Sequence, residues 1–124
     1  MEHQKELTDM VTRILKRYVG NQQLREALHT LDTNLVLLQD QSFQYELHAD
    51  GRIYLFHPPE PSNQGIFTYE QAAQHYVSHH APDKPIKTIQ SLLDNPLAAK
   101  VETIVKDYIR CQENGGRNEN LSRI

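Results

Sequence analysis

At the N-terminus, apolar and charged positions alternate with the period of an α-helix. Apolar residues recur three and four positions apart and charged side chains fill the positions between them, which is typical of a helix with one buried side. The apolar stripe consists of Leu7, Met10, Val11, Ile14, Leu15, Tyr18 and Val19. We expect Gly20 to end this helix in a left-handed conformation and Asn21 to cap a second helix, with a stripe of Leu24, Ala27, Leu28 and Leu31. The pattern therefore predicts two helices that meet at a tight corner.

The leucines that follow allow two interpretations. A heptad spacing that would extend the second helix to residue 38 is kept by Leu24, Leu28, Leu31, Leu35 and Leu38. The segment Asp32-Thr33-Asn34 interrupts it with residues whose side chains compete for backbone hydrogen bonds. We therefore favour a short buried strand over residues 35–38, and a helix through residues 32–38 is the alternative.

A β-hairpin is predicted in the middle of the chain. Residues 43–48 and 52–57 alternate in character on either side of Asp50-Gly51, a dipeptide typical of a two-residue type I′ turn. Such a turn pairs Tyr45 with Phe56 and Leu47 with Tyr54. It predicts an aromatic face packed on the core, consisting of Phe43, Tyr45, Leu47, Tyr54 and Phe56.

The opposite face of this hairpin is the predicted partner-binding surface. It consists of Gln44, Glu46, His48, Ile53, Leu55 and His57. An apolar centre of Ile53 and Leu55 inside a polar rim is the composition of an interaction surface. The alternative is that a terminal helix covers this face and makes both residues part of the core.

The second half of the chain is predicted to be helical. Residues 58–65 have the composition of a loop, and Thr68 with Gln71 forms a capping-box pattern at the start of a helix. Ala81-Pro82-Asp83 ends that helix and starts another, and Asn95-Pro96 is typical of the first turn of a last helix. The predicted fold class is α+β, with an N-terminal helical pair, a two- or three-stranded antiparallel sheet with an Asp-Gly hairpin, and three C-terminal helices. We expect one globular domain over residues 1–113 and a flexible polar tail over residues 114–124.

Composition narrows the function classes. The chain has 124 residues, of which 38% are hydrophobic and 23% charged, and this is the balance of a single globular domain. Its formal net charge of −3 argues against a main partner with a phosphate backbone. The single Cys111 forms no intramolecular disulfide, and no apolar run has the length of a membrane span. We therefore expect a soluble cytoplasmic protein with no membrane partner.

Histidine is the residue type that invites a catalytic hypothesis, since the chain contains seven. Only His75 and His79 have the spacing of metal ligands, one helical turn apart on the same face. His80 is expected to point elsewhere, and no nearby cysteine or carboxylate supplies a third ligand. We expect no metal, no cofactor and no catalytic residue, and a metal-assisted enzyme that uses His75 and His79 is the second alternative.

The function predicted by elimination is a small non-catalytic protein-interaction module, such as an inhibitor, an adaptor or a chaperone-like accessory protein. Its partner is expected to be another protein, and a homo-oligomer is left open. The first alternative is a nucleic-acid-binding regulator like a helix-turn-helix protein, with the second helix of the motif after Ala81-Pro82-Asp83. That helix offers Lys84 and Lys87 but has Pro85 in its first turn and no arginine, which makes it a poor reader of DNA.

Overall fold

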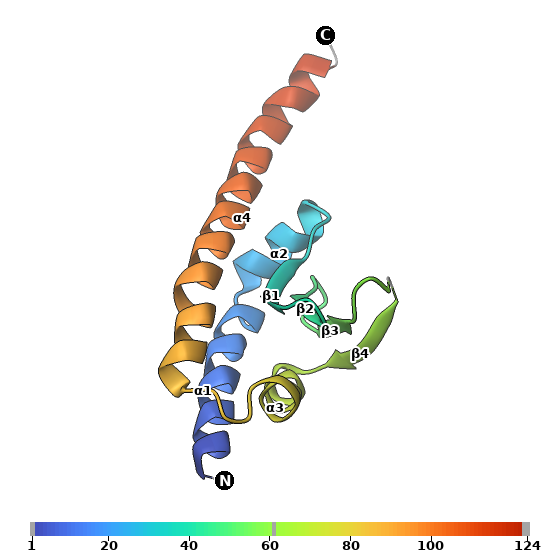
Figure 1. The fold of residues 1–124 in the computed structure, drawn as a ribbon. Helices are drawn as coiled ribbons and strands as arrows, with labels where there is room; N and C mark the ends of the chain where they lie inside the picture. Colours follow the sequence, from blue (N-terminus) through green and yellow to red (C-terminus); the bar gives the residue numbers. More distant parts are fainter. Residues whose placement is uncertain (1, 61, 123–124) are drawn as a thin grey trace.

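The computed structural model describes residues 2–60 and 62–122 and has an α+β fold (Figure 1). Two helices, α1 (Glu2–Val19) and α2 (Gln22–Thr30), precede the sheet. The strands are β1 (Leu35–Gln39), β2 (Gln44–Leu47), β3 (Ile53–Phe56) and β4 (Asn63–Phe67). Two helices follow them, α3 (Tyr69–His80) and α4 (Ile86–Ser122). None of the helices within the described residues is both long enough and apolar enough to span a membrane.

The N-terminal helical pair is confirmed. The apolar stripe of α1 is buried from Leu7 to Tyr18, and the side chain of Asn21 caps α2 by accepting a hydrogen bond from the Leu24 N–H at 3.0 Å. The expected left-handed conformation of Gly20 is wrong, because its φ angle is not positive. Instead the Gly20 N–H donates to the Lys16 carbonyl at 2.9 Å and continues the bonding of α1 into the corner.

The strand interpretation of residues 35–38 is also confirmed. Helix α2 ends before them because Asp32 adopts a left-handed conformation with φ 51°. The Thr33 N–H donates to the Leu28 carbonyl at 3.0 Å and the Asp32 N–H donates to that of His29 at 3.2 Å. These two bonds form a Schellman motif, which satisfies carbonyls at the end of a helix and turns the chain away from its axis.

The sheet has four antiparallel strands in the order β1-β2-β3-β4, so the expectation of two or three strands is wrong. The loop predicted over residues 58–65 ends earlier, because β4 begins at Asn63. Gly65 lies within this edge strand, and glycine in a strand often marks a place where another group approaches the backbone closely. A Cβ at Gly65 would lie 2.9 Å from the ring of Phe67, so glycine is what allows that ring to lie close to the strand.

The predicted hairpin register is wrong by one residue. The loop has three residues, Ala49 to Gly51, and Leu47 lies opposite Ile53 rather than Tyr54. Gly51 alone adopts a left-handed conformation, with φ 84°, and its N–H donates to the His48 carbonyl at 2.9 Å. This is a tight turn followed by a left-handed glycine, the arrangement of the common three-residue hairpin loop. The same Asp-Gly pair suits both loops, so the local pattern does not discriminate between them.

The shift changes which face of β3 is buried. Ile53 and Leu55 are 0% and 2% exposed and lie in the core, which contradicts their assignment to a partner-binding surface. Tyr54 and Phe56 are half-buried on the opposite face, which contradicts their assignment to the core. Tyr45 is buried as predicted.

The core lies between the inner face of the sheet and the helices. Helix α3 packs on α1, and α4 packs on α1, α2 and β1. The side chains that meet there include Leu15, Leu28, Tyr45, Leu47, Ile53, Leu55, Val77 and Leu97.

A single helix replaces the last two of the three predicted C-terminal helices. Pro96 lies inside α4 and does not start a new helix. A proline within a helix leaves a carbonyl one turn earlier without its partner. Pro96 and Leu92 are both exposed, so water can reach that carbonyl, while buried Leu93 and Leu97 hold the helix to the core on either side. Helix α4 continues through the predicted tail to Ser122, and Arg123 and Ile124 lie outside the described residues.

Candidate interaction face

The side of the sheet that faces away from the core is the candidate interaction face, and we call it the outer face. Alternation along the strands places Val36, Gln44, Glu46, His48, Tyr54, Phe56 and Ile66 on it. One row runs across all four strands, from Val36 through Glu46 and Tyr54 to Ile66. Ile66 is 45% exposed, and the other members of this row are half-buried. No helix in the described part of the chain buries this face as the core side is buried.

Three of the six predicted surface residues lie on the outer face, namely Gln44, Glu46 and His48. Ile53 and Leu55 lie in the core, as stated above. His57 is exposed beyond the end of β3 and lies close enough to His75 and His80 on α3 for its charge to affect both. It therefore belongs to the α3 side of the sheet and not to the outer face.

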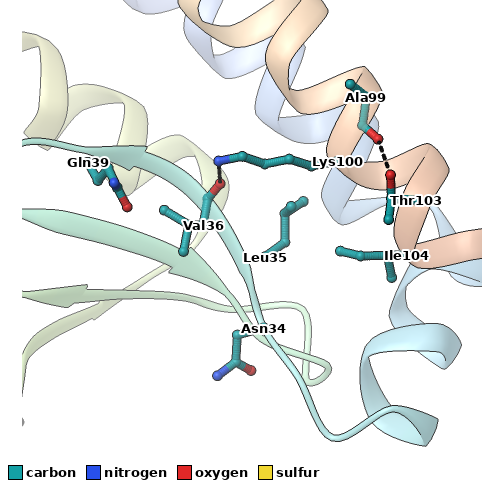
Figure 2. Close-up of a pocket in the computed structure, with 8 residues that line it drawn as sticks. All are labelled: Asn34, Leu35, Val36, Gln39, Ala99, Lys100, Thr103 and Ile104. Carbon is teal, nitrogen blue, oxygen red and sulfur yellow. Dashed lines mark hydrogen bonds between the residues drawn. The ribbon is translucent and has the colours of Figure 1, made fainter. Parts of the chain in front are cut away.

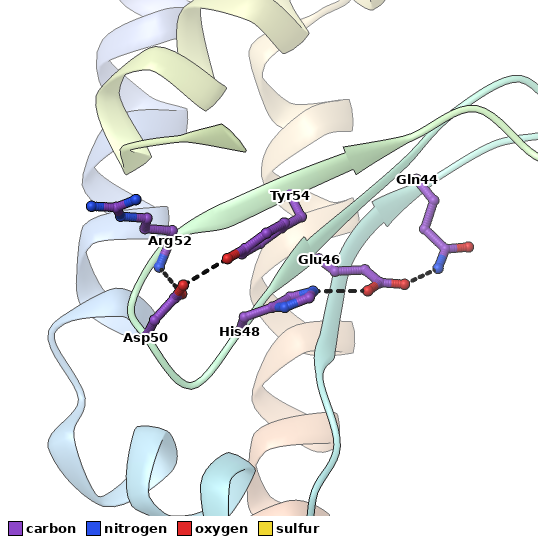
Figure 3. Close-up of polar contacts among 6 residues, drawn as sticks. All are labelled: Gln44, Glu46, His48, Asp50, Arg52 and Tyr54. Atoms are coloured by element: carbon purple, nitrogen blue, oxygen red, sulfur yellow. Dashed lines mark hydrogen bonds and ion pairs between the residues drawn. The ribbon is translucent and has the colours of Figure 1, made fainter. Parts of the chain in front are cut away.

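Asp50 organises the hairpin end of the outer face (Figure 3). Its carboxylate accepts a hydrogen bond from the Tyr54 hydroxyl at 2.7 Å and another from the Arg52 N–H at 2.8 Å. Burial acts to raise the pKa of Asp50, but the two hydrogen bonds together with the nearby charges of His48 and Arg52 outweigh it, and the pKa is lowered. The hydrogen bond between Tyr54 and Asp50 also raises the pKa of Tyr54, because the hydroxyl donates to a carboxylate.

His48 and Glu46 form the second polar group on this face. His48 Nε2 lies 3.2 Å from Glu46 Oε1, and the Gln44 amide donates to the other oxygen of the same carboxylate (Figure 3). The imidazole of His48 also stacks on the Tyr54 ring, with centroids 3.8 Å apart and planes at 21°. Both polar groups therefore meet at Tyr54, whose ring and hydroxyl are held from two sides.

A second cluster, composed of histidines, lies on α3. The rings of His75 and His79 stack with centroids 4.1 Å apart, so the pair shares a face of the helix as predicted. His75 Nδ1 lies 2.6 Å from the Tyr45 hydroxyl, a contact that the sequence pattern did not reveal. His80 was expected to lie apart, yet its ring centroid is 6.1 Å from that of His75. The capping box predicted for this helix is present at Thr68 and Gln71.

Burial and the charges of neighbouring histidines lower the pKa values of two histidines in this cluster, His75 and His80. The pKa of His75 is lowered first by burial and then by the nearby His79, His80 and His57. The pKa of His80 is lowered by burial, His79 and His57, and Asp40 opposes this shift. His80 stacks on Phe43 at 4.0 Å, and its Nε2 atom is buried without a hydrogen-bond partner.

The structure adds no support for the two alternatives, a metal site at His75 and His79 and a helix-turn-helix motif. Within the described residues no three histidine, cysteine or acidic side chains are placed to hold one metal ion. The segment predicted to resemble a helix-turn-helix consists of α3, which packs on α1, and the start of α4, which packs on α1. Ala81 between them is fully buried, and its N–H donates to the Val77 carbonyl at 3.2 Å.

Comparison of the chain with protein-family models, with curated proteins and with solved structures finds no match.

Proposed function

We propose that the protein is a small non-catalytic interaction module that binds another protein through the outer face of its sheet. The observation that carries the proposal is the group of partly exposed apolar side chains on that face, which consists of Tyr54, Phe56 and Ile66. Tyr54 and Ile66 lie side by side on neighbouring strands, with Phe56 next along β3. An apolar centre with a polar rim of Gln44, Glu46 and His48 is the usual composition of a protein interface.

The side chains of this face are already ordered before any partner binds. Asp50 holds the Tyr54 hydroxyl and His48 covers the Tyr54 ring, so the largest side chain at the centre has little rotational freedom. Association costs less when interface side chains are ordered in the free protein. Tyrosine also provides contact area and a polar group together, which is why it is common at binding hot spots.

Charge indicates the kind of partner. Residues 35–68 contain four acidic side chains and one arginine, and two of the acidic ones, Glu46 and Asp50, lie on or beside the outer face. A partner surface with apolar residues at its centre and lysine or arginine at its rim complements this face. The acidity disfavours nucleic acid, so the helix-turn-helix alternative has less support.

The test uses two isoleucines of matched exposure. Ile66 on the outer face is 45% exposed and Ile109 on α4 is 43% exposed. We expect Ile66→Ser to abolish capture of a specific partner from the native host, while Ile109→Ser retains it. Each exposed substitution should change the free energy of unfolding by no more than about 0.5 kcal/mol. Retention of the partner by Ile66→Ser, and by Phe56→Ser as a second variant, would refute the role of the outer face.

The more specific roles remain proposals. An inhibitor, an adaptor and a chaperone-like accessory protein all need a partner surface and no catalytic group, and the captured partner would distinguish them. The cytoplasmic location expected from the single Cys111 also stays a prediction.

A further inference from the structure

A groove runs between strand β1 and helix α4, at the β1 edge of the sheet, where the row of the outer face ends in Val36 and opposite the edge that carries Ile66. β1 is an edge strand, paired only with β2, and α4 lies along its other side. The groove has a volume of about 470 Å³, within the range of sites that bind ligands. Its walls are Asn34 just before β1, Leu35, Val36 and Gln39 from β1, and Ala99, Lys100, Thr103 and Ile104 from α4 (Figure 2).

A second hollow extends this groove along the same side of the molecule. It has a volume of about 300 Å³ and shares Gln39 and Lys100 with the first. Its walls include Leu38, Phe43 and Leu92, and Leu92 is 51% exposed although it is a large aliphatic side chain. The two hollows together form a trough that follows β1 and continues along the turn after it to Phe43, and Lys100 lines both hollows.

Lys100 occupies the free edge of β1. Its ammonium group donates a hydrogen bond to the Val36 carbonyl at 3.2 Å (Figure 2). That carbonyl therefore points away from β2, and the Val36 N–H points the same way, because both groups of a strand residue face one edge. A lysine on an edge strand protects it against unwanted pairing, but a flexible exposed side chain can move aside.

We propose that this trough binds an extended acidic peptide segment of a partner protein, which adds to β1 as an outer strand and places a carboxylate side chain on Lys100. The register of β1 shifts between Val36 and Leu38, so the regular edge is interrupted there, and an extended segment is the occupant that can pair with the N–H and C=O groups of Val36. The charged side chains in the walls of the two hollows are Lys84, Lys100 and Asp40, so the trough has an excess of positive charge. This inference does not depend on the outer face, which is acidic and would attract the opposite kind of partner.

The carboxylate and the peptide backbone act together in this arrangement. A carboxylate is a stronger partner for the Lys100 ammonium than a neutral carbonyl is. When Lys100 turns to it, the Val36 carbonyl becomes free to accept an N–H from the incoming strand. Aliphatic side chains on either side of the acidic residue would then contact Leu35 and Ile104 at one end and Leu92 at the other.

The experiment selects peptides on the full chain. A phage-displayed library of random peptides of about eight residues, long enough to run past both ends of β1, is selected on the wild-type protein. Ala99 and Ala98 are neighbouring exposed residues of α4, but only Ala99 lines the groove, while Ala98 lines a hollow beside α1. Ala99→Trp therefore fills the groove and Ala98→Trp is its matched control. Synthetic copies of the enriched peptides are measured by fluorescence anisotropy.

We expect enriched peptides with one aspartate or glutamate between β-branched residues. Ala99→Trp should weaken their binding about tenfold or more, and Ala98→Trp should leave it unchanged. In Lys100→Met, the acidic peptide should bind no more tightly than the same peptide with its glutamate or aspartate replaced by glutamine or asparagine. Lys106→Met removes a lysine that is exposed elsewhere on α4, and it should leave binding of the acidic peptide unchanged. Ile66→Ser should leave peptide binding intact, which separates this site from the outer face.

Three results would overturn the proposal. One is that no peptide is enriched, and another is that the enriched peptides bind Ala99→Trp as tightly as wild type. The third is a dimer in sedimentation that Ala99→Trp abolishes and Ala98→Trp preserves, which would assign the groove to a second copy of the chain. If Ala99→Trp does not fold, Thr103→Trp fills the same groove from an exposed position without adding a charge and replaces it in each comparison.

Discussion

The hydroxyl group of Tyr45 lies 2.6 Å from Nδ1 of His75 and joins the buried face of the sheet to helix α3. Tyr45 is 1% exposed, and burial raises the pKa of its hydroxyl, so the group keeps its proton at any physiological pH. The hydrogen bond gives a polar atom inside the core the partner that it needs. It also links β2 to the face of α3 on which His75 and His79 stack.

Two substitutions of Tyr45 separate its packing from its hydrogen bond. Tyr45→Ala should lower the free energy of unfolding by about 3 to 5 kcal/mol, because it removes a large buried ring. Tyr45→Phe should lower it by only about 1 kcal/mol, since the ring stays and one hydrogen bond is lost. Gln44→Ala, next to it on the outer face, should have almost no effect. Urea unfolding measures all three, and equal losses for Tyr45→Ala and Gln44→Ala would contradict the assigned faces of β2.

The register of the hairpin predicts opposite behaviour for two neighbours on β3. Ile53→Ser places a hydroxyl in the core and leaves a cavity, and should lower the free energy of unfolding by about 2 to 5 kcal/mol. Tyr54→Ser removes a half-buried side chain of the outer face and leaves no cavity in the core, so it should lower the free energy of unfolding by less than Ile53→Ser does. Thermal unfolding followed by circular dichroism distinguishes these outcomes. If Ile53→Ser stays stable and loses a binding partner, Ile53 lies on the outer face, and the register with a two-residue turn is the correct one.

The strength of each sequence signal explains which parts of the fold could be predicted. The stripe from Leu7 to Tyr18 repeats over several turns, so the periodicity of α1 was unambiguous. The Asp50-Gly51 pair suits both a two-residue and a three-residue loop. The observed three-residue loop is contacted by a residue from outside the hairpin, which no pattern within the hairpin reports. The Arg25 side chain of α2 donates to the Ala49 carbonyl at 3.3 Å and packs on Gly51.

Two other predictions, a helix start at Pro96 and the face assignment of β3, were also wrong because contacts outside the local segment decide them. Pro96 favours a helix start locally, but the burial of Leu93 and Leu97 on the same side keeps α4 continuous. The outer face was assigned to the correct residues of β2 and the incorrect ones of β3, because a shift of one residue exchanges the two sides of a strand. The hydrogen bond between Tyr45 and His75 joins residues thirty positions apart, and no local pattern reports such a contact.

The buried, unpartnered nitrogen of His80 predicts a stabilising substitution. His80 Nε2 has no hydrogen-bond partner, and a buried polar atom in that state costs about 1 to 3 kcal/mol. Phenylalanine has a ring of similar size that would keep the stacking on Phe43. We therefore expect His80→Phe to raise the free energy of unfolding by about 1 kcal/mol. The matched control is His79→Phe, on the exposed side of the helix, which should give no gain. A destabilised His80→Phe variant would show that the imidazole has a partner after all.

The histidines of α3 also predict how stability depends on pH. Burial and the neighbouring histidines lower the pKa values of His75 and His80 in the folded state below the ordinary value of 6.5. Above that value both groups are neutral in the folded and in the unfolded chain, so they contribute no pH dependence. As the pH falls below 6.5, the unfolded chain takes up protons that the folded chain resists, and the free energy of unfolding decreases. Asp50 does not contribute in this range, because its pKa is lowered from 3.8 and its stabilisation is lost only in stronger acid.

Urea unfolding at a series of pH values from about 8 to 5 measures this effect, since the range spans the titration of an unperturbed histidine. We expect the free energy of unfolding to be level above the titration range and to fall below it. The double variant His75→Gln with His80→Phe should flatten the acid side of the curve, because neither replacement side chain takes up a proton. His29→Gln, on the exposed surface of α2, should leave the wild-type curve unchanged. If the wild-type curve is level down to the acid end, or if the double variant keeps the same slope, the two histidines are not the groups that resist protonation in the folded protein.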